Sequence, residues 1–411
     1  MSTSVLTAAS PSTITPATAP APSSPALSVV MPVLTPETQA LADQLAAGIR
    51  TWIECESPSS DAAAIERMAA LVAGQARAAG LTVTLTHAGP KNLPILVASN
   101  RTPGDERPGI LLLAHLDTVH PIGTLKINPC RIEDDKLYGP GTFDMKGGTY
   151  LALTALGELS AAGSTLLPVD FLMVPDEEVG SHASRPAIES YAKRARYTLV
   201  CEPARPNGGK CVTARKGTGM TKLTVTGRPS HAGMAHEKGR SAIREMAHQI
   251  IALEAMTDYS RGITVSVGTI SGGTVTNTVP SNCEVMVDFR IPDEAAGKEI
   301  EARMLSLKPV DPDTTLTIEV ELNRPAMVKT PEAQALLDQL IIYADAAGFE
   351  LIDAPVTGGG SDANFTAALG IPSVDGLGAE GDGAHTLREY IFVSSLPRRL
   401  QFWRNTLSTL V

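Results

Sequence analysis

Three apolar runs in the first half of the chain each lead into a histidine or an acidic residue. They are Ile110–Ala114 before His115, Val169–Val174 before Glu177 and Glu178, and Tyr197–Cys201 before Glu202. Short apolar runs of this kind are typical of strands buried in a parallel sheet. The carboxyl ends of such strands meet at one edge of the sheet, where α/β proteins build their sites. The sequence therefore predicts an α/β fold with a polar site at one sheet edge.

The alternation of apolar runs with helical stretches continues to about residue 210 and predicts a central, mostly parallel sheet flanked by helices. From Gly217 the pattern changes. Strand-like stretches at 220–226, 263–270 and 283–291, with helical stretches at 239–256 and 294–307, predict a smaller inserted α+β domain with an antiparallel sheet. We expect one domain at 37–214 and 329–411, interrupted by this inserted domain at 215–328.

Residues 1–36 are dense in Ala, Pro, Ser and Thr and nearly uncharged, so we expect a disordered tail. The rest has an ordinary globular composition, with 43% hydrophobic and 19% charged residues in the whole chain. A net charge of −10 argues against nucleic acid or an anionic membrane as a partner, and no apolar run reaches the roughly 18 residues that span a bilayer. Five scattered cysteines and the lack of a basic start favour a cytoplasmic location, with export left open.

The residues at the strand ends are of the types that bind metal. With Asp117, Asp144 and His385, they give an ordered set of His and carboxylate groups. Two divalent ions about 3.5–4 Å apart need a bridging carboxylate and mixed His and carboxylate ligands. One further carboxylate must stay unligated to accept a proton from water, and the adjacent Glu177 and Glu178 can divide these roles. Asp117 shares a strand face with His115 and can hold its imidazole in the metal-binding tautomer.

Taken singly, each of these residues has a simpler explanation. A lone His after a strand is more often a polar residue with ordinary partners, Asp144 alone could be a helix N-cap, and Glu177-Glu178 alone is most often a solvated loop. The ordered set, placed at strand ends and in a Gly-rich turn, indicates a site for two metal ions. Cobalt or manganese would accept the same ligand types as zinc.

From about residue 40 to the C-terminus the chain resembles the di-zinc metallopeptidase family of aminoacylases, dipeptidases and carboxypeptidases. The resemblance is closest to its glutamate carboxypeptidase (carboxypeptidase G) branch. Beyond the metal-type residues, it rests on four motifs in order: Ser-His-Ala-Gly at 230–233, Thr-Asn-Thr-Val-Pro at 276–280, Asn-Arg-Pro-Ala at 323–326 and Thr-Gly-Gly-Gly-Ser-Asp at 357–362.

The resemblance implies two zinc ions per subunit. His115, Asp144 and Glu202 would hold one ion, while Asp144, Glu178 and His385 would hold the other, so that Asp144 is the bridge. Glu177 would be the general base that takes a proton from water and passes it to the leaving nitrogen. The bond between Asp144 and Met145 would be cis.

The resemblance also implies roles in substrate binding. His231 would stabilise the oxyanion of the reaction, reaching the site of a partner subunit in a homodimer formed through the inserted domain, or its own site on closure. Arg324 with Asn277 would bind the α-carboxylate, and Lys210, helped by Arg290, would bind a side-chain carboxylate. Gly359 and Gly360 would let backbone amides approach the substrate. Two simpler readings stay open: an exposed turn residue for His231, and a solvated side chain for Lys210.

These residues predict a zinc-dependent carboxypeptidase or amidohydrolase that releases a C-terminal amino acid, with glutamate expected, from peptides or folate-like N-acyl conjugates. The alternative is an aminoacylase, dipeptidase or other small-amide deacylase of the same family. A catalytically dead peptide-binding protein is disfavoured, because a binding module needs no unligated base at Glu177. Phosphate binding at Gly358–Gly360 is disfavoured too, since no Gly-Lys-Ser/Thr sequence follows.

Overall fold

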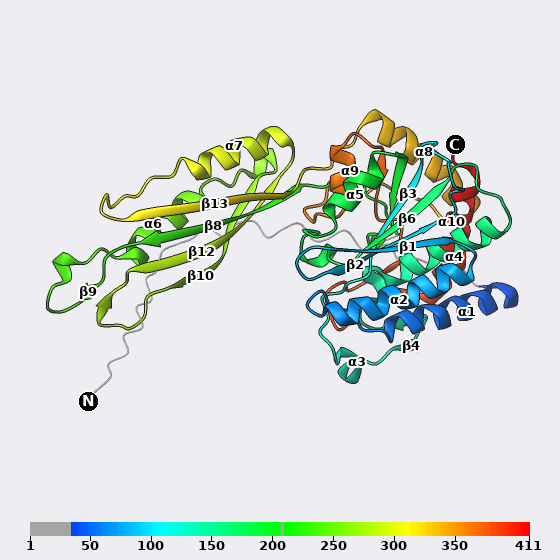
Figure 1. The fold of residues 1–411 in the computed structure, drawn as a ribbon, viewed down its shortest axis with the longest axis horizontal. Helices are drawn as coiled ribbons and strands as arrows, with labels where there is room; N and C mark the ends of the chain where they lie inside the picture. Colours follow the sequence, from blue (N-terminus) through cyan, green and yellow to red (C-terminus); the bar gives the residue numbers. More distant parts are fainter. Residues whose placement is uncertain (1–33, 207–208) are drawn as a thin grey trace, which may run out of the picture.

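The computed structural model describes residues 34–206 and 209–411, which form two bodies (Figure 1). The smaller body is elongated and consists of one stretch from the middle of the chain, coloured green to yellow. Within the described ranges no helix is long and apolar enough to cross a membrane. Most of the predicted tail, residues 1–33, lies outside these ranges, and the first helix, α1 (Pro36–Ile53), begins at Pro36.

The larger body is built on a six-stranded sheet. Its strands are β1 (Thr82–Ala88), β2 (Leu93–Ser99), β3 (Gly109–His115), β6 (Val169–Val174), β7 (Ala195–Val200) and β14 (Ser373–Val374), in the spatial order β1-β2-β6-β3-β7-β14. The four strands β6, β3, β7 and β14 are parallel, while β1 and β2 join antiparallel at one edge. The predicted α/β class with a mostly parallel sheet is confirmed.

Helices cover both faces of this sheet. Successive side chains of a strand point to opposite sides, and in the central strands the side chains on both sides are buried and mostly apolar. Leu112 packs in a first apolar cluster, whereas Leu111 and Leu113 pack in another on the opposite face. The helices of the first cluster are α1, α2 (Ala62–Ala78), α4 (Gly147–Ala161), α8 (Pro331–Ala346) and α10 (Leu396–Thr409); those of the second are α5 (Arg185–Ala192) and α9 (Ala363–Ala368).

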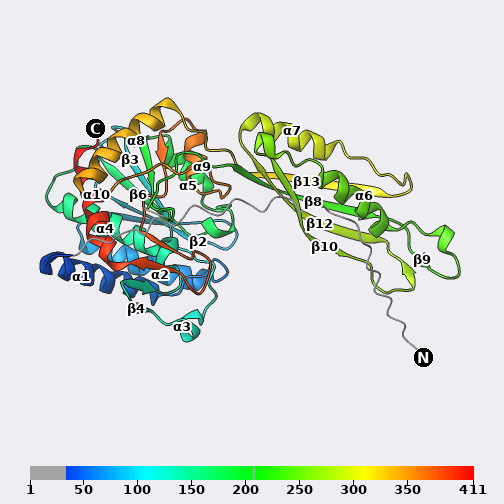
Figure 2. The ribbon, with the colours of Figure 1, turned by 180° about the vertical axis from the view of Figure 1, so that it is seen from behind.

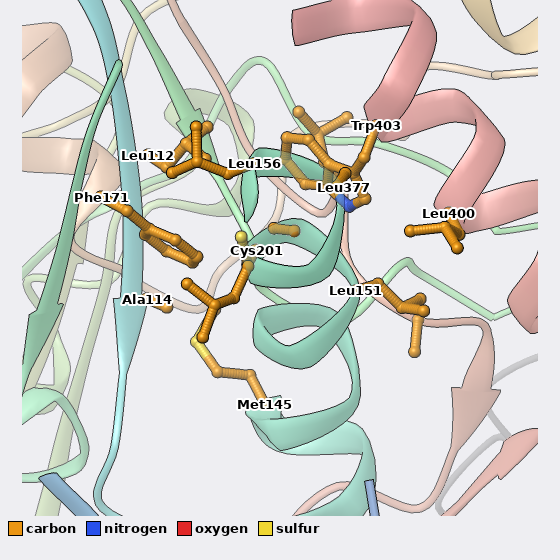
Figure 3. Packing of buried hydrophobic residues seen from close by; sticks show 14 of the residues in the cluster. Leu112, Ala114, Met145, Leu151, Leu156, Phe171, Cys201, Leu377, Leu400 and Trp403 are labelled. Atoms are coloured by element: carbon orange, nitrogen blue, oxygen red, sulfur yellow. The ribbon is translucent and has the colours of Figure 1, made fainter. Parts of the chain in front are cut away.

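Helix α4 lies in the middle of the first cluster, and Figure 3 shows its leucines among side chains of the sheet and of α10. Buried residues occur nearly all round this helix, which is the pattern of a helix surrounded by protein. Its fully buried Leu151 and Leu156 fix its position, and with it the position of the loop that precedes it.

The same local signal starts the helices that open the two chain segments of this body. Thr35 and Thr330 are N-caps whose hydroxyl groups accept from the amides of Thr38 and Ala333, and each is followed by a proline. Proline fits the first turn because a backbone N–H at that position would have no acceptor within the helix. The chain therefore re-enters the larger body at a sequence-encoded helix start.

A small four-stranded sheet joins distant parts of the chain at the edge of the larger body. Its strands are β4 (Arg131–Glu133), β5 (Lys136–Tyr138), β15 (Gly381–Asp382) and β16 (Tyr390–Phe392), in the order β15-β16-β5-β4, and the short helix α3 (Thr124–Ile127) precedes them. The loop between β15 and β16 carries His385. This sheet was not predicted, because strands of two or three residues give no readable periodicity.

The smaller body is an antiparallel sheet with two helices against one face, as predicted. Its elements are β8 (Gly217–Thr226), α6 (Ala242–Glu254), β10 (Thr264–Gly272), β12 (Asn282–Ile291), α7 (Glu294–Leu305) and β13 (Thr315–Arg324), with the strands in the order β10-β12-β8-β13. The apolar side chains facing α6 and α7 form a core of their own. The edge strand β13 is a fourth strand that the prediction missed.

A two-stranded sheet, here called the tip sheet, forms the outer tip of the smaller body. It pairs β9 (Ser230–His231) with β11 (Thr278–Val279), and both views place β9 at the end away from the larger body (Figures 1 and 2). Thr218, at the start of β8, pairs with Arg324, whereas Thr226, at the other end of β8, leads toward the tip sheet. A ten-residue strand spans about 33 Å, so the tip sheet and Arg324 lie at opposite ends of the larger antiparallel sheet.

Candidate metal centre and active-site cleft

The parallel strands bring the predicted metal ligands to one sheet edge. His115 is the last residue of β3, Glu178 lies in the turn after β6, and Glu202 follows β7. Asp144 lies in the loop before α4, and His385 lies in the β15–β16 loop with a φ of 64°. Five residues that are far apart in the sequence therefore surround one point.

A glycine lets the Asp144 loop approach the end of β7. A Cβ atom on Gly148, at the start of α4, would lie 2.6 Å from the carbonyl oxygen of Cys201 and 2.6 Å from the Cα atom of Gly378. Only glycine permits this close packing of helix and strand end. The loop also contains a cis peptide bond between Asp144 and Met145, as the resemblance implied.

The ligand atoms fall into two groups that share Asp144. His115, Asp144 and Glu202 form one group, and Asp144, Glu178 and His385 form the other; within each group the ligand atoms lie within 4.8 Å of one another. Oδ1 of Asp144 lies 3.0 Å from Nε2 of His115, and its Oδ2 lies 3.2 Å from Nε2 of His385. Asp144 thus presents one oxygen to each group, which is the geometry of a bridging carboxylate.

The donor set fits divalent metal ions. Each group combines one imidazole with two carboxylates, a mixture typical of zinc sites. Oε1 of Glu178 is buried without a hydrogen-bond partner among the described residues, and a buried carboxylate oxygen without a partner is costly unless a cation is nearby. The carboxylates therefore leave coordination capacity that the protein itself does not use.

Proximity to carboxylates keeps the two imidazoles charged when no metal is bound. Burial opposes the charge of His115, but its hydrogen bond to Asp144 and the neighbouring carboxylates raise its pKa well above 6.5. Hydrogen bonds to Asp144 and Glu178 raise the pKa of His385 to about 10. Burial raises the pKa of Glu202 well above 4.5. A metal ion must displace these protons, because only neutral His and ionised carboxylates are ligands.

We expect zinc binding at pH 7 to release at least one proton. His385 is protonated below its pKa of about 10, so its proton must leave when the ion binds. Zinc affinity should therefore rise as the pH rises from 6 to 9. Calorimetric titration of the metal-free protein in buffers with different ionisation enthalpies measures the number of protons released. Zinc binding without proton release at pH 7 would contradict this account of the site.

Asp117 was expected to hold the His115 imidazole in its metal-binding tautomer, and it lies against that ring. Its main-chain oxygen is 2.8 Å from Nδ1 of His115, which leaves Nε2 for a metal, and its Oδ1 is 3.6 Å from the same nitrogen. The Asp117 carboxylate accepts from the amides of Glu177 and Glu178, both at 3.2 Å, and from the hydroxyl group of Ser59 at 2.6 Å. This carboxylate therefore holds the Glu177–Glu178 turn against the His115 strand.

Glu177 belongs to neither ligand group. Its Oε1 accepts from Nη2 of Arg324 at 2.9 Å, and burial raises the pKa of Glu177 to about 8. The same Nη2 also lies 3.0 Å from the Ser181 hydroxyl and 3.2 Å from Oδ1 of Asp362. The predicted base and the predicted carboxylate-binding arginine are thus paired with each other.

Glu389 was not singled out from the sequence, yet it holds the Asp144 loop in place. One of its oxygens accepts from the amides of Phe143 at 2.7 Å and Asp144 at 2.8 Å. The other accepts from the amide of Gly141 at 3.0 Å and lies 2.8 Å from Nε2 of His120. Its position four residues after His385 carries no motif that would have revealed this role.

Removal of the Glu389 carboxylate in Glu389→Ala should lower the free energy of unfolding by about 3–5 kcal/mol, because three amides and one imidazole would lose a buried charged partner. Zinc affinity should fall with it, since the loop carries the shared ligand. Urea unfolding and zinc titration measure both effects. Glu133→Ala is the control, because that carboxylate is exposed and pairs with Arg131 at the surface. Values for Glu389→Ala equal to those of the control would contradict the assigned role.

A cleft with two lobes flanks the ligand groups, and both lobes share Glu177, Glu178, Gly360 and His385. The lobe of about 290 Å³, here called the arginine lobe, is also lined by Arg205, Arg215 and Gly359. The lobe of about 400 Å³, here called the lid lobe, is also lined by Arg290 and Arg324 and by residues of β8. A substrate can thus extend to both sides of the ligand groups.

The predicted substrate-binding residues do not all lie at the cleft. Arg324 and Arg290 line the lid lobe, but the Arg290 guanidinium is held by both carboxylate oxygens of Asp288, at 2.8 and 2.6 Å. Gly360 is required beside Arg324, because a Cβ atom on it would lie 2.9 Å from Cδ of that arginine. Lys210 is not among the residues that line either lobe.

His231 and Asn277 lie together, but away from the cleft of their own chain. Both lie at the tip sheet, where the amide of Ala232 donates to the Asn277 carbonyl at 2.9 Å. His231 is exposed, and its ring Nδ1 accepts from the amides of Gly233 and Met234. Asn277 and Arg324 were predicted to act as a pair, but within one chain they are separated by the length of the four-stranded sheet of the smaller body. Their joint role stays a prediction.

Comparisons with known proteins agree with this geometry. The family model described as peptidase family M20/M25/M40 matches residues 111–409. Carboxypeptidase G2 of Pseudomonas sp. (strain RS-16) is 31% identical over 374 residues, which is 88% of this chain and 89% of that protein. Succinyl-diaminopimelate desuccinylase of Paracidovorax citrulli is 27% identical over 67% of this chain and 73% of its own length.

Among solved structures, an M20 family metallo-carboxypeptidase from Sulfolobus solfataricus shares the fold. Its TM-score is 0.73 at 17% identity, over 89% of this chain and 99% of that one. The match of the family model covers well over half of the chain, and the ligand groups lie inside the matched range. The chain therefore belongs to peptidase family M20/M25/M40, a family of metal-dependent hydrolases of peptide and amide bonds.

Proposed function

We propose that this protein is a two-zinc carboxypeptidase that releases a C-terminal amino acid, preferentially glutamate, from small peptides or N-acyl amino acids. The observation that carries the proposal is the pair of ligand groups that share Asp144, with the buried Glu177 beside them and in neither group. The similarity to carboxypeptidase G2 supports a carboxypeptidase, and glutamate is expected from the motifs that resemble the glutamate carboxypeptidase branch.

In hydrolysis, the ligand groups and Glu177 would have different roles. The two groups would each hold one divalent ion, and the ions would polarise the scissile carbonyl and lower the pKa of a water molecule. Glu177 accepts the proton of the attacking water and delivers it to the leaving nitrogen. Burial raises the pKa of Glu177 to about 8 while the site holds no metal. Cations bound beside Glu177 would lower this pKa, so that the carboxylate is ionised at pH 7 and able to accept a proton.

Arg324 links substrate binding to the state of the base. In this structure one of its nitrogens, Nη2, is engaged by Glu177, Ser181 and Asp362. A substrate carboxylate that reaches this guanidinium from the lid lobe competes with Glu177 for it, and an Arg fork suits a carboxylate. Binding of the C-terminal carboxylate would thus free Glu177 to accept a proton.

A deacylase with an acidic acyl group is the second candidate. The similarity to a succinyl-diaminopimelate desuccinylase favours it, and the arginine lobe offers cationic groups that would suit a succinyl carboxylate. An aminoacylase or dipeptidase with an apolar leaving residue would have no use for these cations.

We also propose a homodimer formed through the smaller body. His231 is exposed at the tip and far from its own cleft, so a role at a reacting oxygen requires a partner subunit or a large closure of the smaller body. A donor placed at the developing oxyanion contributes about 3–4 kcal/mol to catalysis. Light scattering gives the oligomeric state, and mixing His231→Ala with Glu177→Gln chains tests complementation between subunits.

The proposed function is tested by amino-acid release from N-acyl derivatives of Glu, Asp, Gln, Leu, Phe and Ala, with zinc and with a chelator. Zinc-dependent release that is fastest for glutamate is expected. Faster release of apolar residues would retain the hydrolytic mechanism but overturn the specificity. Release that persists in the chelator would contradict the metal mechanism, and release from none of the compounds would contradict the carboxypeptidase assignment.

A further inference from the structure

The arginine lobe contains two neighbouring guanidinium groups with different partners. Arg215 is buried, and its Nε donates to Oδ2 of the buried Asp375 at 2.7 Å. Its Nη1 donates to the carbonyl oxygen of Gly359 at 2.9 Å. The charge of Arg215 is therefore balanced within the protein, and its side chain supports the glycine stretch at the wall of the lobe.

Arg205 lacks such a carboxylate. Across residues 34–206 and 209–411, no ion pair to Arg205 is found, and its buried Nε has no hydrogen-bond partner. The contact of its guanidinium is a long one, 3.5 Å from Nη2 to the hydroxyl of Thr357. An unpaired guanidinium in a partly buried position lowers the stability of the free protein, and a bound anion would offset this cost.

The backbone around Arg205 is fixed on both sides. Arg205 and Lys210 exchange backbone hydrogen bonds at 2.8 and 3.1 Å, and the amide of Ala204 donates to the carbonyl of Ala379 at 3.1 Å. Directly opposed residues of an antiparallel pair start from the same face. Here, however, the side chain of Arg205 lines the lobe, whereas that of Lys210 does not. The cation presented to the cleft by this turn is therefore Arg205.

The guanidinium of Arg205 lies beside Gly359. A Cβ atom on Gly359 would stand 4.0 Å from Nη2 of Arg205 and 3.9 Å from Nη1 of Arg215. Both guanidinium groups thus face the bare glycine stretch on the side of the cleft. The negative charges near Arg205 are Asp375, which is already paired with Arg215, and the carboxylates of Glu202 and Asp144. Ligation of divalent ions would neutralise Glu202 and Asp144. The lobe would then carry uncompensated positive charge.

We propose that Arg205 binds a second carboxylate of the substrate, in addition to the carboxylate bound by Arg324. This inference rests on the proposed function and makes Arg205, rather than Lys210, the residue that selects dicarboxylic substrates. The second carboxylate belongs either to the side chain of the leaving amino acid or to the acyl group. The chemistry of recognition is the same in both cases: a charge-assisted, bidentate contact in a partly desolvated lobe.

The test compares acid and amide substrates of the same shape. The leaving-side arm measures kcat/KM for N-acetyl-glutamate against N-acetyl-glutamine. The acyl-side arm compares N-succinyl-alanine with its half-amide. In Arg205→Gln, the acid-over-amide ratio should fall about 10- to 100-fold in one arm, the range supplied by one hydrogen bond to a charged group. Arg205→Lys should restore part of the ratio, and the matched control Lys210→Gln should change neither arm.

A binding measurement separates this inference from the proposed function. Calorimetry with the zinc-loaded protein compares glutamate with glutamine and succinate with succinamate, and Arg205→Gln should lose the preference for the diacid. If the wild type hydrolyses none of the substrates but this preference depends on Arg205, the proposed function fails and the inference stands. Unchanged ratios and unchanged binding preferences in both Arg205 variants, each with wild-type thermal unfolding, would overturn the inference. Loss of the ratio in Lys210→Gln alone would overturn it as well.

Discussion

Replacement of Glu177 by glutamine should lower kcat about 10²- to 10⁴-fold while the zinc content stays at the wild-type level. The change keeps the shape of the side chain but removes the group that accepts the proton, and general base catalysis contributes an effect of this size. The zinc content should not change because Glu177 lies in neither ligand group. Single-turnover kinetics and elemental analysis of the same preparation measure the two quantities.

The adjacent residue provides the matched comparison. Glu178 belongs to the second group, where its Oε2 lies 3.1 Å from Nε2 of His385, so Glu178→Gln should lower the zinc content. Opposite responses of two neighbouring glutamates would separate proton transfer from metal binding. If Glu177→Gln also loses zinc, or retains wild-type kcat, the division of roles proposed for this pair is wrong.

Replacement of Asp144 by alanine should have the largest effect on metal binding. Asp144 contributes one oxygen to each group, so its loss removes a ligand from both sites at once. Zinc affinity should fall by more than about 100-fold, the upper value for loss of an outer-shell partner, and hydrolysis should fall with it. Zinc titration of the metal-free variant measures this effect.

His385→Ala is the control for Asp144→Ala, because His385 belongs to the second group alone. This variant should retain one zinc ion held by the group that contains His115. Two tightly bound ions in Asp144→Ala would show that Asp144 is not the bridge. Loss of both ions in His385→Ala would show that the two sites cannot be occupied independently.

The parts of the fold that follow from periodicity were predictable. Buried runs such as Gly109–Ala114 gave the parallel strands, and the carboxyl ends of those strands placed His115, Glu178 and Glu202 at one edge. Strand β13 was missed although it was readable, because Leu316, Ile318, Val320 and Leu322 alternate with polar residues as in a strand with one exposed face.

The roles of residues that act through the backbone were not predictable. Glu389 and Asp117 bind main-chain amides of loops that are distant in sequence, and which amides face a carboxylate depends on the packed structure. The same limit applied to the arginine lobe. Lys210 was predicted from the resemblance, whereas Arg205, which lines this lobe, was not singled out, because neither periodicity nor a motif shows which side chains line a cleft.

The most direct test of a two-metal hydrolase is a zinc titration of the metal-free protein followed by glutamate release from N-acetyl-glutamate. The account predicts negligible release without metal and a rise in rate that reaches its plateau at two equivalents of zinc per chain. A plateau at one equivalent would contradict a requirement for both ligand groups. Full release before any zinc is added would contradict metal-dependent hydrolysis altogether.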